Sequence, residues 1–66
     1  MIRELAPRER QIAALVAQGK SNAEIGALLK LSERTVGHRL SRYIYRKLGI
    51  HTRTELAIWW QKESKG

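Results

Sequence analysis

The chain has 66 residues, the length of one small domain (1–66), and it contains no cysteine. Disulfides, cysteine-based zinc sites and thiol chemistry are therefore excluded, and its two histidines are a poor basis for another metal site. A net charge of +7 favours a polyanionic partner. No stretch approaches the roughly 20 apolar residues of a membrane-spanning helix, and no signal peptide opens the chain. We therefore expect a cytoplasmic, nucleoid-associated protein that does not bind a membrane.

Apolar residues recur at spacings of three and four, which predicts helices throughout. The first helix is predicted over 7–18. Pro7 suits a first helical position, and Gly19 is a natural left-handed stop. Ala6 stands at the N-cap, where its side chain cannot accept a hydrogen bond. The expected buried stripe of this helix is Ile12, Leu15 and Val16.

The second helix is predicted over 22–29. Ser21 and Glu24 have the spacing of a capping box, in which each side chain pairs with the backbone N–H of the other residue. Gly26 is small enough for another backbone to approach closely. A tight turn at Lys30 and Leu31 is expected to follow.

The third helix is predicted over 33–48, with Ser32 as its N-cap and Gly49 as its stop. Its expected apolar stripe is Val36, Leu40, Ile44 and Leu48. The fourth helix is predicted over 53–62, with a capping box between Thr52 and Glu55, and residues 62–66 are expected to fray. Leu56 and Trp60 are expected to face the core, and Ile58 and Trp59 to fall on the other side.

Two short helices joined by a tight turn, the second more basic, are typical of a helix-turn-helix that places the second helix in the major groove of DNA. The face opposite the apolar stripe would carry Arg34, Gly37, His38, Ser41, Arg42 and Tyr45. Arg34 and Arg42 are candidates for bidentate contacts to guanine, and Ser32 and Thr35 at the helix start for contacts to phosphate. Arg39 lies nearer the core side, where it is expected to pair with Glu24 or Glu55. A solvated charged face is the alternative interpretation.

The chain resembles the LuxR-type (GerE-like) helix-turn-helix domain over about residues 5 to 60. Each matching segment is weak alone, and their order and spacing carry the resemblance. The segments are Leu5-Ala6-Pro7-Arg8-Glu9-Arg10, Gly19-Lys20-Ser21-Asn22-Ala23-Glu24-Ile25, Leu31-Ser32-Glu33-Arg34-Thr35-Val36, Lys47-Leu48-Gly49-Ile50 and Arg53-Thr54-Glu55-Leu56-Ala57.

The resemblance implies an all-α domain of four helices whose third helix is the recognition helix. Base-reading positions would fall on Gly37, His38 and Ser41, in addition to Arg34 and Arg42. Dimerisation would use the fourth helix through Ile58 and Trp59. The expected phosphate contacts are Ser21, Asn22, Ser32, Thr35, Arg46 and Lys47.

The sequence departs from this family at four places. Arg39 replaces the family's usual histidine, and His38 stands one position earlier. Ala6 replaces the usual Thr or Ser before the proline. Gly37 stands where a Lys often reads bases. One extra residue lies between Thr35 and Lys47, and helix phase from Val36 places it near Tyr45 and Arg46, so we expect a recognition helix that is longer or distorted at its end.

Our leading hypothesis is a sequence-specific regulator of transcription that binds double-stranded DNA as a homodimer. No set of residues supports catalysis, a metal site or a cofactor, so we do not expect an enzyme. The alternatives are a protein-interaction module that docks on RNA polymerase or another regulator, and a non-specific nucleoid binder. The chain would be either a domain of a larger regulator or a complete small protein.

Overall fold

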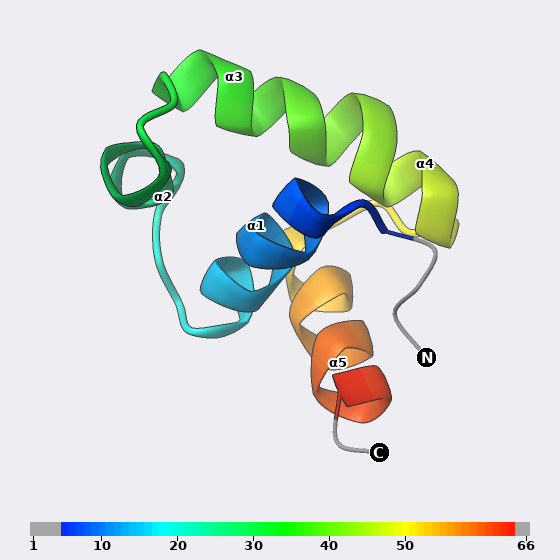
Figure 1. Ribbon diagram of the computed structural model, residues 1–66. Coiled ribbons are helices and arrows are strands. Elements are labelled where there is room, and N and C mark those ends of the chain that lie inside the picture. The colour runs from blue at the N-terminus through cyan, green and yellow to red at the C-terminus, as the bar shows by residue number, and fades with distance from the viewer. Residues whose placement is uncertain (1–4, 65–66) are drawn as a thin grey trace.

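The computed structural model describes residues 5–64, and every secondary-structure element in this part of the chain is a helix (Figure 1). Helices α3 and α4 are joined without a break by the π-helical segment η1, so that residues 33–48 form one long helix. The predicted four-helix fold is thus confirmed. The elements are α1 (Pro7–Ala17), α2 (Asn22–Leu29), α3 (Glu33–His38), η1 (Arg39–Ile44), α4 (Tyr45–Leu48) and α5 (Arg53–Ser64).

The predicted helix bounds agree with the structure except at two C-terminal ends. Helix α1 ends at Ala17, and Gln18 is its C-cap. Helix α5 continues to Ser64, so the fraying expected over 62–66 is wrong for 62–64, and residues 65 and 66 lie outside the described part. Helix α5 packs on α1, and this tertiary contact supports the helix in a way that its local sequence does not reveal.

Two predicted capping boxes are present. At α2, Ser21 Oγ accepts the N–H of Glu24 at 3.1 Å, and Glu24 Oε1 accepts the N–H of Ser21 at 2.8 Å. At α5, Thr52 Oγ1 accepts the N–H of Glu55 at 3.1 Å, and Glu55 Oε1 accepts the N–H of Thr52 at 3.0 Å. Each pair satisfies two backbone donors that a helix start leaves unpaired.

The turn between α2 and α3 is tight because a glycine lies under it. Lys30 adopts a left-handed conformation with φ of 60°, and the N–H of Leu31 donates to the carbonyl oxygen of Gly26 at 2.8 Å. A Cβ atom added at Gly26 would collide with the backbone carbonyl of Leu31. The predicted close approach at Gly26 is therefore confirmed, and it sets the distance between the two helices.

One small core joins all the helices. The long helix formed by α3, η1 and α4 lies across one side of the molecule, with α1 beneath it, while α5 packs on α1 and runs away from the long helix (Figure 1). The long helix therefore has one face on the core and the other in solvent. The buried apolar residues are Leu5, Ile12, Ala13, Val16, Ile25, Val36, Leu40, Ile44 and Leu56. Among residues 5–64, no helix is long and apolar enough to cross a membrane.

The long helix is widened in its middle. The N–H of Tyr45 donates to the carbonyl oxygen of Leu40, five residues back, where an α-helix would use a residue four back. Such a turn accommodates one additional residue. The distortion expected near Tyr45 and Arg46 is therefore present, but it lies one turn earlier, over Arg39–Ile44.

We predict opposite effects when Gly26 and Gly37 are replaced by alanine. Gly26→Ala should lower the free energy of unfolding by about 1–3 kcal/mol, because backbone must move to admit the methyl group. Gly37→Ala should raise it by about 0.5–1 kcal/mol, because alanine is the better helix former and its Cβ would meet Asn22 Nδ2 at an ordinary 3.6 Å. Urea denaturation followed by circular dichroism measures both changes, and a tolerated Gly26→Ala would contradict the tight turn.

Candidate nucleic-acid interface

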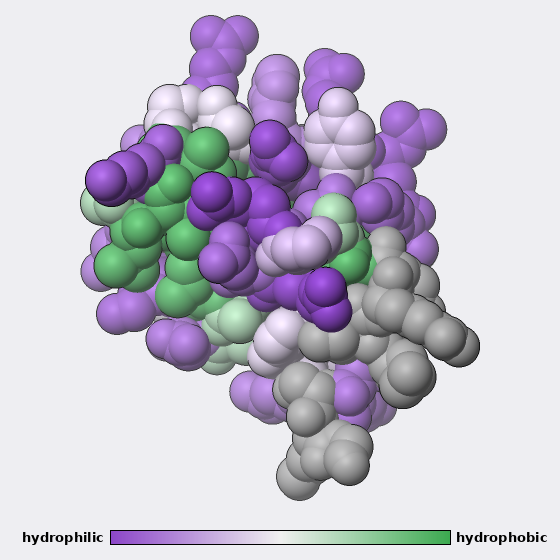
Figure 2. All heavy atoms as spheres, viewed as in Figure 1, coloured by the Kyte–Doolittle hydropathy of each residue, from purple (hydrophilic) through white to green (hydrophobic). Residues whose placement is uncertain are grey.

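The long helix presents the predicted base-reading side chains to solvent. Arg34, His38, Ser41 and Arg42 are all exposed. Within residues 5–64, neither the two arginines nor His38 has a hydrogen bond or an ion pair. These groups are therefore available to a ligand, and Figure 2 shows hydrophilic side chains along the edge of the molecule that α3 to α4 forms.

Gly37, the remaining predicted base-reading residue, is partly covered by the start of α2. Its nearest side chain is Asn22, whose Nδ2 would lie 3.6 Å from an added Cβ. Asn22 Oδ1 in turn accepts a hydrogen bond from Arg53 Nη1. The amide of Asn22 is thus oriented by protein contacts, with its oxygen on Arg53 and its nitrogen toward the recognition helix.

Two of the residues predicted to contact phosphate, Ser21 and Ser32, cap helices, and a third, Thr35, is bonded to one of these caps. Ser21 belongs to the capping box of α2. Ser32 Oγ accepts the N–H of Thr35 at 3.0 Å and donates to Thr35 Oγ1 at 2.8 Å. The predicted cap at Ser32 is confirmed, and the hydroxyls lie at the exposed start of α3. Contacts of these residues to phosphate remain predictions.

Lys47 has an acidic partner within the protein. Its Nζ lies 2.8 Å from Oε1 of Glu9, which is only 5% exposed and which also accepts the N–H of Ala6 at 2.9 Å. Burial by itself would raise the pKa of Glu9. The hydrogen bonds from Lys47 and Ala6, with the charges of Lys47 and Arg39, outweigh burial and hold that pKa below its ordinary value.

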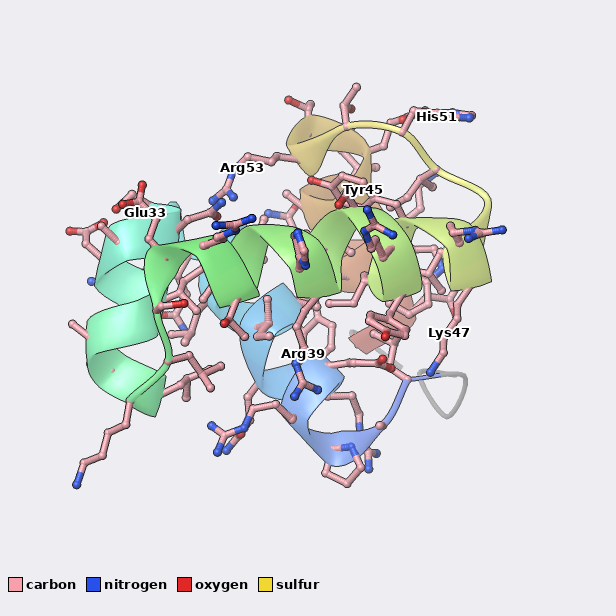
Figure 3. The ribbon with its side chains drawn as sticks, turned by 90° about the horizontal axis from the view of Figure 1, so that it is seen from above. Glu33, Arg39, Tyr45, Lys47, His51 and Arg53 are labelled. Carbon is pink, nitrogen blue, oxygen red and sulfur yellow. The ribbon has the colours of Figure 1, made fainter. Side chains whose placement is uncertain are left out.

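The position of Arg39 corrects one prediction. Arg39 lies near Glu9 on the α1 side of the long helix (Figure 3), and not against Glu24 or Glu55. Those two carboxylates accept backbone N–H groups at the starts of α2 and α5. They are held by their own caps, so the pairing expected for Arg39 is wrong.

Arg53 is a connecting residue that the sequence did not reveal. Its Nη2 donates to the carbonyl oxygen of Lys20 at 2.6 Å, and its Nη1 donates to Asn22 Oδ1. Arg53 thereby joins the start of α5 to the start of α2. These partners lie more than 30 residues away in the chain, and no local pattern predicts such a pairing.

Tyr45 is not on the outward face where helix phase placed it. It is partly buried and lies on the Arg53 side of the long helix, opposite Arg39 and Lys47 (Figure 3). Burial raises the pKa of its hydroxyl, although the nearby charge of Arg53 acts in the other direction. The prediction assumed a regular α-helix, and the widened turn at η1 rotates every residue that follows it.

The two predicted dimer residues differ in exposure. Ile58 is 48% exposed. Trp59 is partly buried and packs against the core, as does Trp60. The expectation that Trp59 points away from the core is therefore wrong, because α5 packs more than one of its stripes against the core.

The family of the chain follows from comparison with known proteins. The family described as bacterial regulatory proteins, luxR family, matches residues 3–60. The chain belongs to this family. It is a DNA-binding helix-turn-helix domain of the kind that transcription regulators carry.

Several curated proteins are similar to the domain. The probable HTH-type transcriptional regulator GfsR of Streptomyces halstedii is 41% identical over 56 residues, which cover 85% of this chain and 23% of that protein. The nitrate/nitrite response regulator protein NarL of Escherichia coli is 36% identical over 62 residues, covering 94% of this chain and 28% of NarL. The response regulator Rre1 of Synechocystis is 45% identical over 53 residues, which cover 80% of this chain and 22% of Rre1. The chain thus spans about a quarter of the length of these relatives.

We predict that Glu9→Gln destabilises the domain in a pH-dependent way. At pH 7 the free energy of unfolding should fall by about 1–2 kcal/mol, since a charged acceptor of two hydrogen bonds is lost. The folded-state pKa of Glu9 is depressed, so its stabilisation is complete above the unfolded pKa of about 4.3 and is lost as pH falls through the folded value.

The difference between wild type and Glu9→Gln should therefore shrink below about pH 4, measured by urea denaturation across pH. Glu33→Gln is the matched control, because Glu33 also lies in the first turn of a helix but is exposed. A constant difference down to pH 2 would show that the carboxylate charge is not what stabilises this contact.

Proposed function

We propose that the domain binds specific sequences in duplex DNA as part of a transcription regulator, with the helix of residues 33–48 in the major groove. The observation that carries this proposal is the row of exposed, unpartnered Arg34, His38 and Arg42 on that helix. Glu33 is its only acidic residue. Arginines that have no internal partner keep their charge and donor capacity for phosphates and base edges, and an unpartnered histidine keeps its ring nitrogens for the same contacts.

Base reading would come from Arg34, His38, Ser41 and Arg42, of which the arginines suit bidentate contacts to guanine. Gly37 contributes no side chain and lets the helix approach the bases closely. Ser21, Asn22, Ser32 and Thr35 lie at the starts of α2 and α3, where backbone and hydroxyl donors suit phosphate. We leave Lys47 out of the proposed contacts because it is paired with Glu9.

The proposal extends to a homodimer that forms through α5. Ile58 is a large apolar residue exposed on this helix, and a two-fold dimer would place its recognition helices on two half-sites in inverted repeat. Trp59 is mainly a core residue, so Ile58 is the better anchor. A nucleoid-associated, cytoplasmic location accompanies this function.

A protein-docking role is the second candidate. The face formed by α1 and α2 carries an apolar patch of Ala14, Leu15, Leu28 and Leu29, with Leu28 59% exposed, and Figure 2 shows this hydrophobic area beside the basic edge. Exposed apolar patches mark protein contacts, and RNA polymerase or another regulator would be the partner. The patch leaves the basic face free, so the two roles are compatible.

We predict that Arg34→Ala and Arg42→Ala each weaken binding to a selected duplex by about 1–3 kcal/mol. The duplex is obtained by selection from a randomised pool, and affinity is measured by fluorescence anisotropy. Lys62→Ala, an exposed cation on α5, is the matched control and should change affinity little. Binding of the wild type without any selected motif would contradict sequence specificity and favour a non-specific nucleoid binder.

We predict that Ile58→Glu weakens binding to a duplex with two half-sites but not to a duplex with one. A buried, unpaired carboxylate in the dimer interface is costly, whereas the DNA-facing helix is untouched. Gln61→Glu, an exposed position on the same helix with the same charge change, serves as the control. Equal losses for Ile58→Glu on both duplexes would contradict a dimer through α5.

A further inference from the structure

The apolar residues of the long helix are spaced four apart, which a regular α-helix does not keep on one face. Four residues turn the helix by about 400°, so each step drifts by about 40° and three steps drift by about 120°. Val36, Leu40 and Ile44 are nevertheless all fully or almost fully buried, and Leu48 packs against the same core. The widened turn at η1 absorbs one residue and brings the row back into line.

A second row with the same spacing lies two residues before the first. It consists of Arg34, His38, Arg42 and Arg46, and all four are exposed. Two residues along a helix turn it by about 200°, so this row lies opposite the core. Arg39 and Lys47 project from one side of the helix and Tyr45 lies on the other (Figure 3), and they delimit the outward ridge.

The widened turn changes the direction of Arg46 relative to the rest of the row. In a regular α-helix Tyr45, nine residues after Val36, would stand about half a turn from the core, and Arg46 would be rotated toward the side where Arg39 and Lys47 lie. In the structure Tyr45 is partly buried and Arg46 is exposed. Within residues 5–64, Arg46 has no hydrogen bond or ion pair, unlike Lys47 beside it.

We infer that the π-helical turn is a positioning device that aligns Arg34, His38, Arg42 and Arg46 into one straight row of exposed hydrogen-bonding side chains, and that Arg46 contacts a DNA phosphate at the far end of the half-site. The inference rests on the proposed function. The row extends over twelve residue steps, or about 18 Å at 1.5 Å per step, which corresponds to about five base-pair steps of 3.4 Å. Without the widened turn, side chains with this spacing would rotate around the helix, and the last of them would no longer face the same groove as the first.

The test compares Arg46→Gln with the exchange variant Tyr45→Arg/Arg46→Tyr, which keeps composition and net charge. Duplex binding is measured by anisotropy over a range of salt concentrations. Arg46→Gln should weaken binding about fivefold to tenfold and reduce the salt slope by about one, without changing the selected sequence. The exchange variant should weaken binding similarly, because its arginine leaves the ridge.

Lys62→Gln is the control for loss of one positive charge, and its affinity should stay within about twofold of wild type. Circular dichroism checks that each variant folds. If the exchange variant does not fold, Arg46→Gln alone tests whether Arg46 contacts DNA. An Arg46→Gln protein that binds like wild type, or a folded exchange variant that does so, overturns this inference alone. Wild-type protein that binds no duplex overturns the proposed function as well.

Discussion

The four apolar residues Val36, Leu40, Ile44 and Leu48 must all reach one core, although their spacing exceeds the period of an α-helix. A domain of this size has no second core to receive those that drift away. The helix therefore gives up regular geometry over Arg39–Ile44 and keeps its apolar contacts. The directions of the solvent-facing side chains depend on this widened turn, because the core-facing row and the solvent-facing row belong to the same helix and rotate together.

Two sets of polar and charged side chains have different roles in the domain. Glu9, Lys47, Arg53 and Asn22 connect elements that are distant in the chain, and their hydrogen bonds hold α1, α2 and α5 around the long helix. Arg34, His38, Arg42 and Arg46 have no such contacts among the described residues. The residues of the first set hold the helices in place. The residues of the second set make no such contacts within the described part of the protein, so their donors stay directed at solvent. Side chains that are already positioned lose less entropy on binding a polyanion.

Two glycines illustrate how the same residue serves different ends. Gly26 lies directly under the carbonyl of Leu31 and sets the spacing of the helix-turn-helix. Gly37 meets only the amide of Asn22 at an ordinary distance, so packing does not require it. Gly37 is partly covered by the start of α2 and partly open to solvent, and its missing side chain leaves the helix surface low at that point.

The sequence by itself determined the helices, most of their ends and the family. Capping boxes at Ser21 and Thr52 and the stop at Gly49 are local, and such interactions act between residues three or four apart. The tertiary structure alone decided where the surplus residue is absorbed, which cations are paired, and that Trp59 packs inward. Those outcomes depend on partners 30 or more residues away, such as Glu9 for Lys47 and Asn22 for Arg53. A helix-phase argument cannot find such partners, because it treats each helix as regular and alone, whereas the shared core makes the helices adjust to one another.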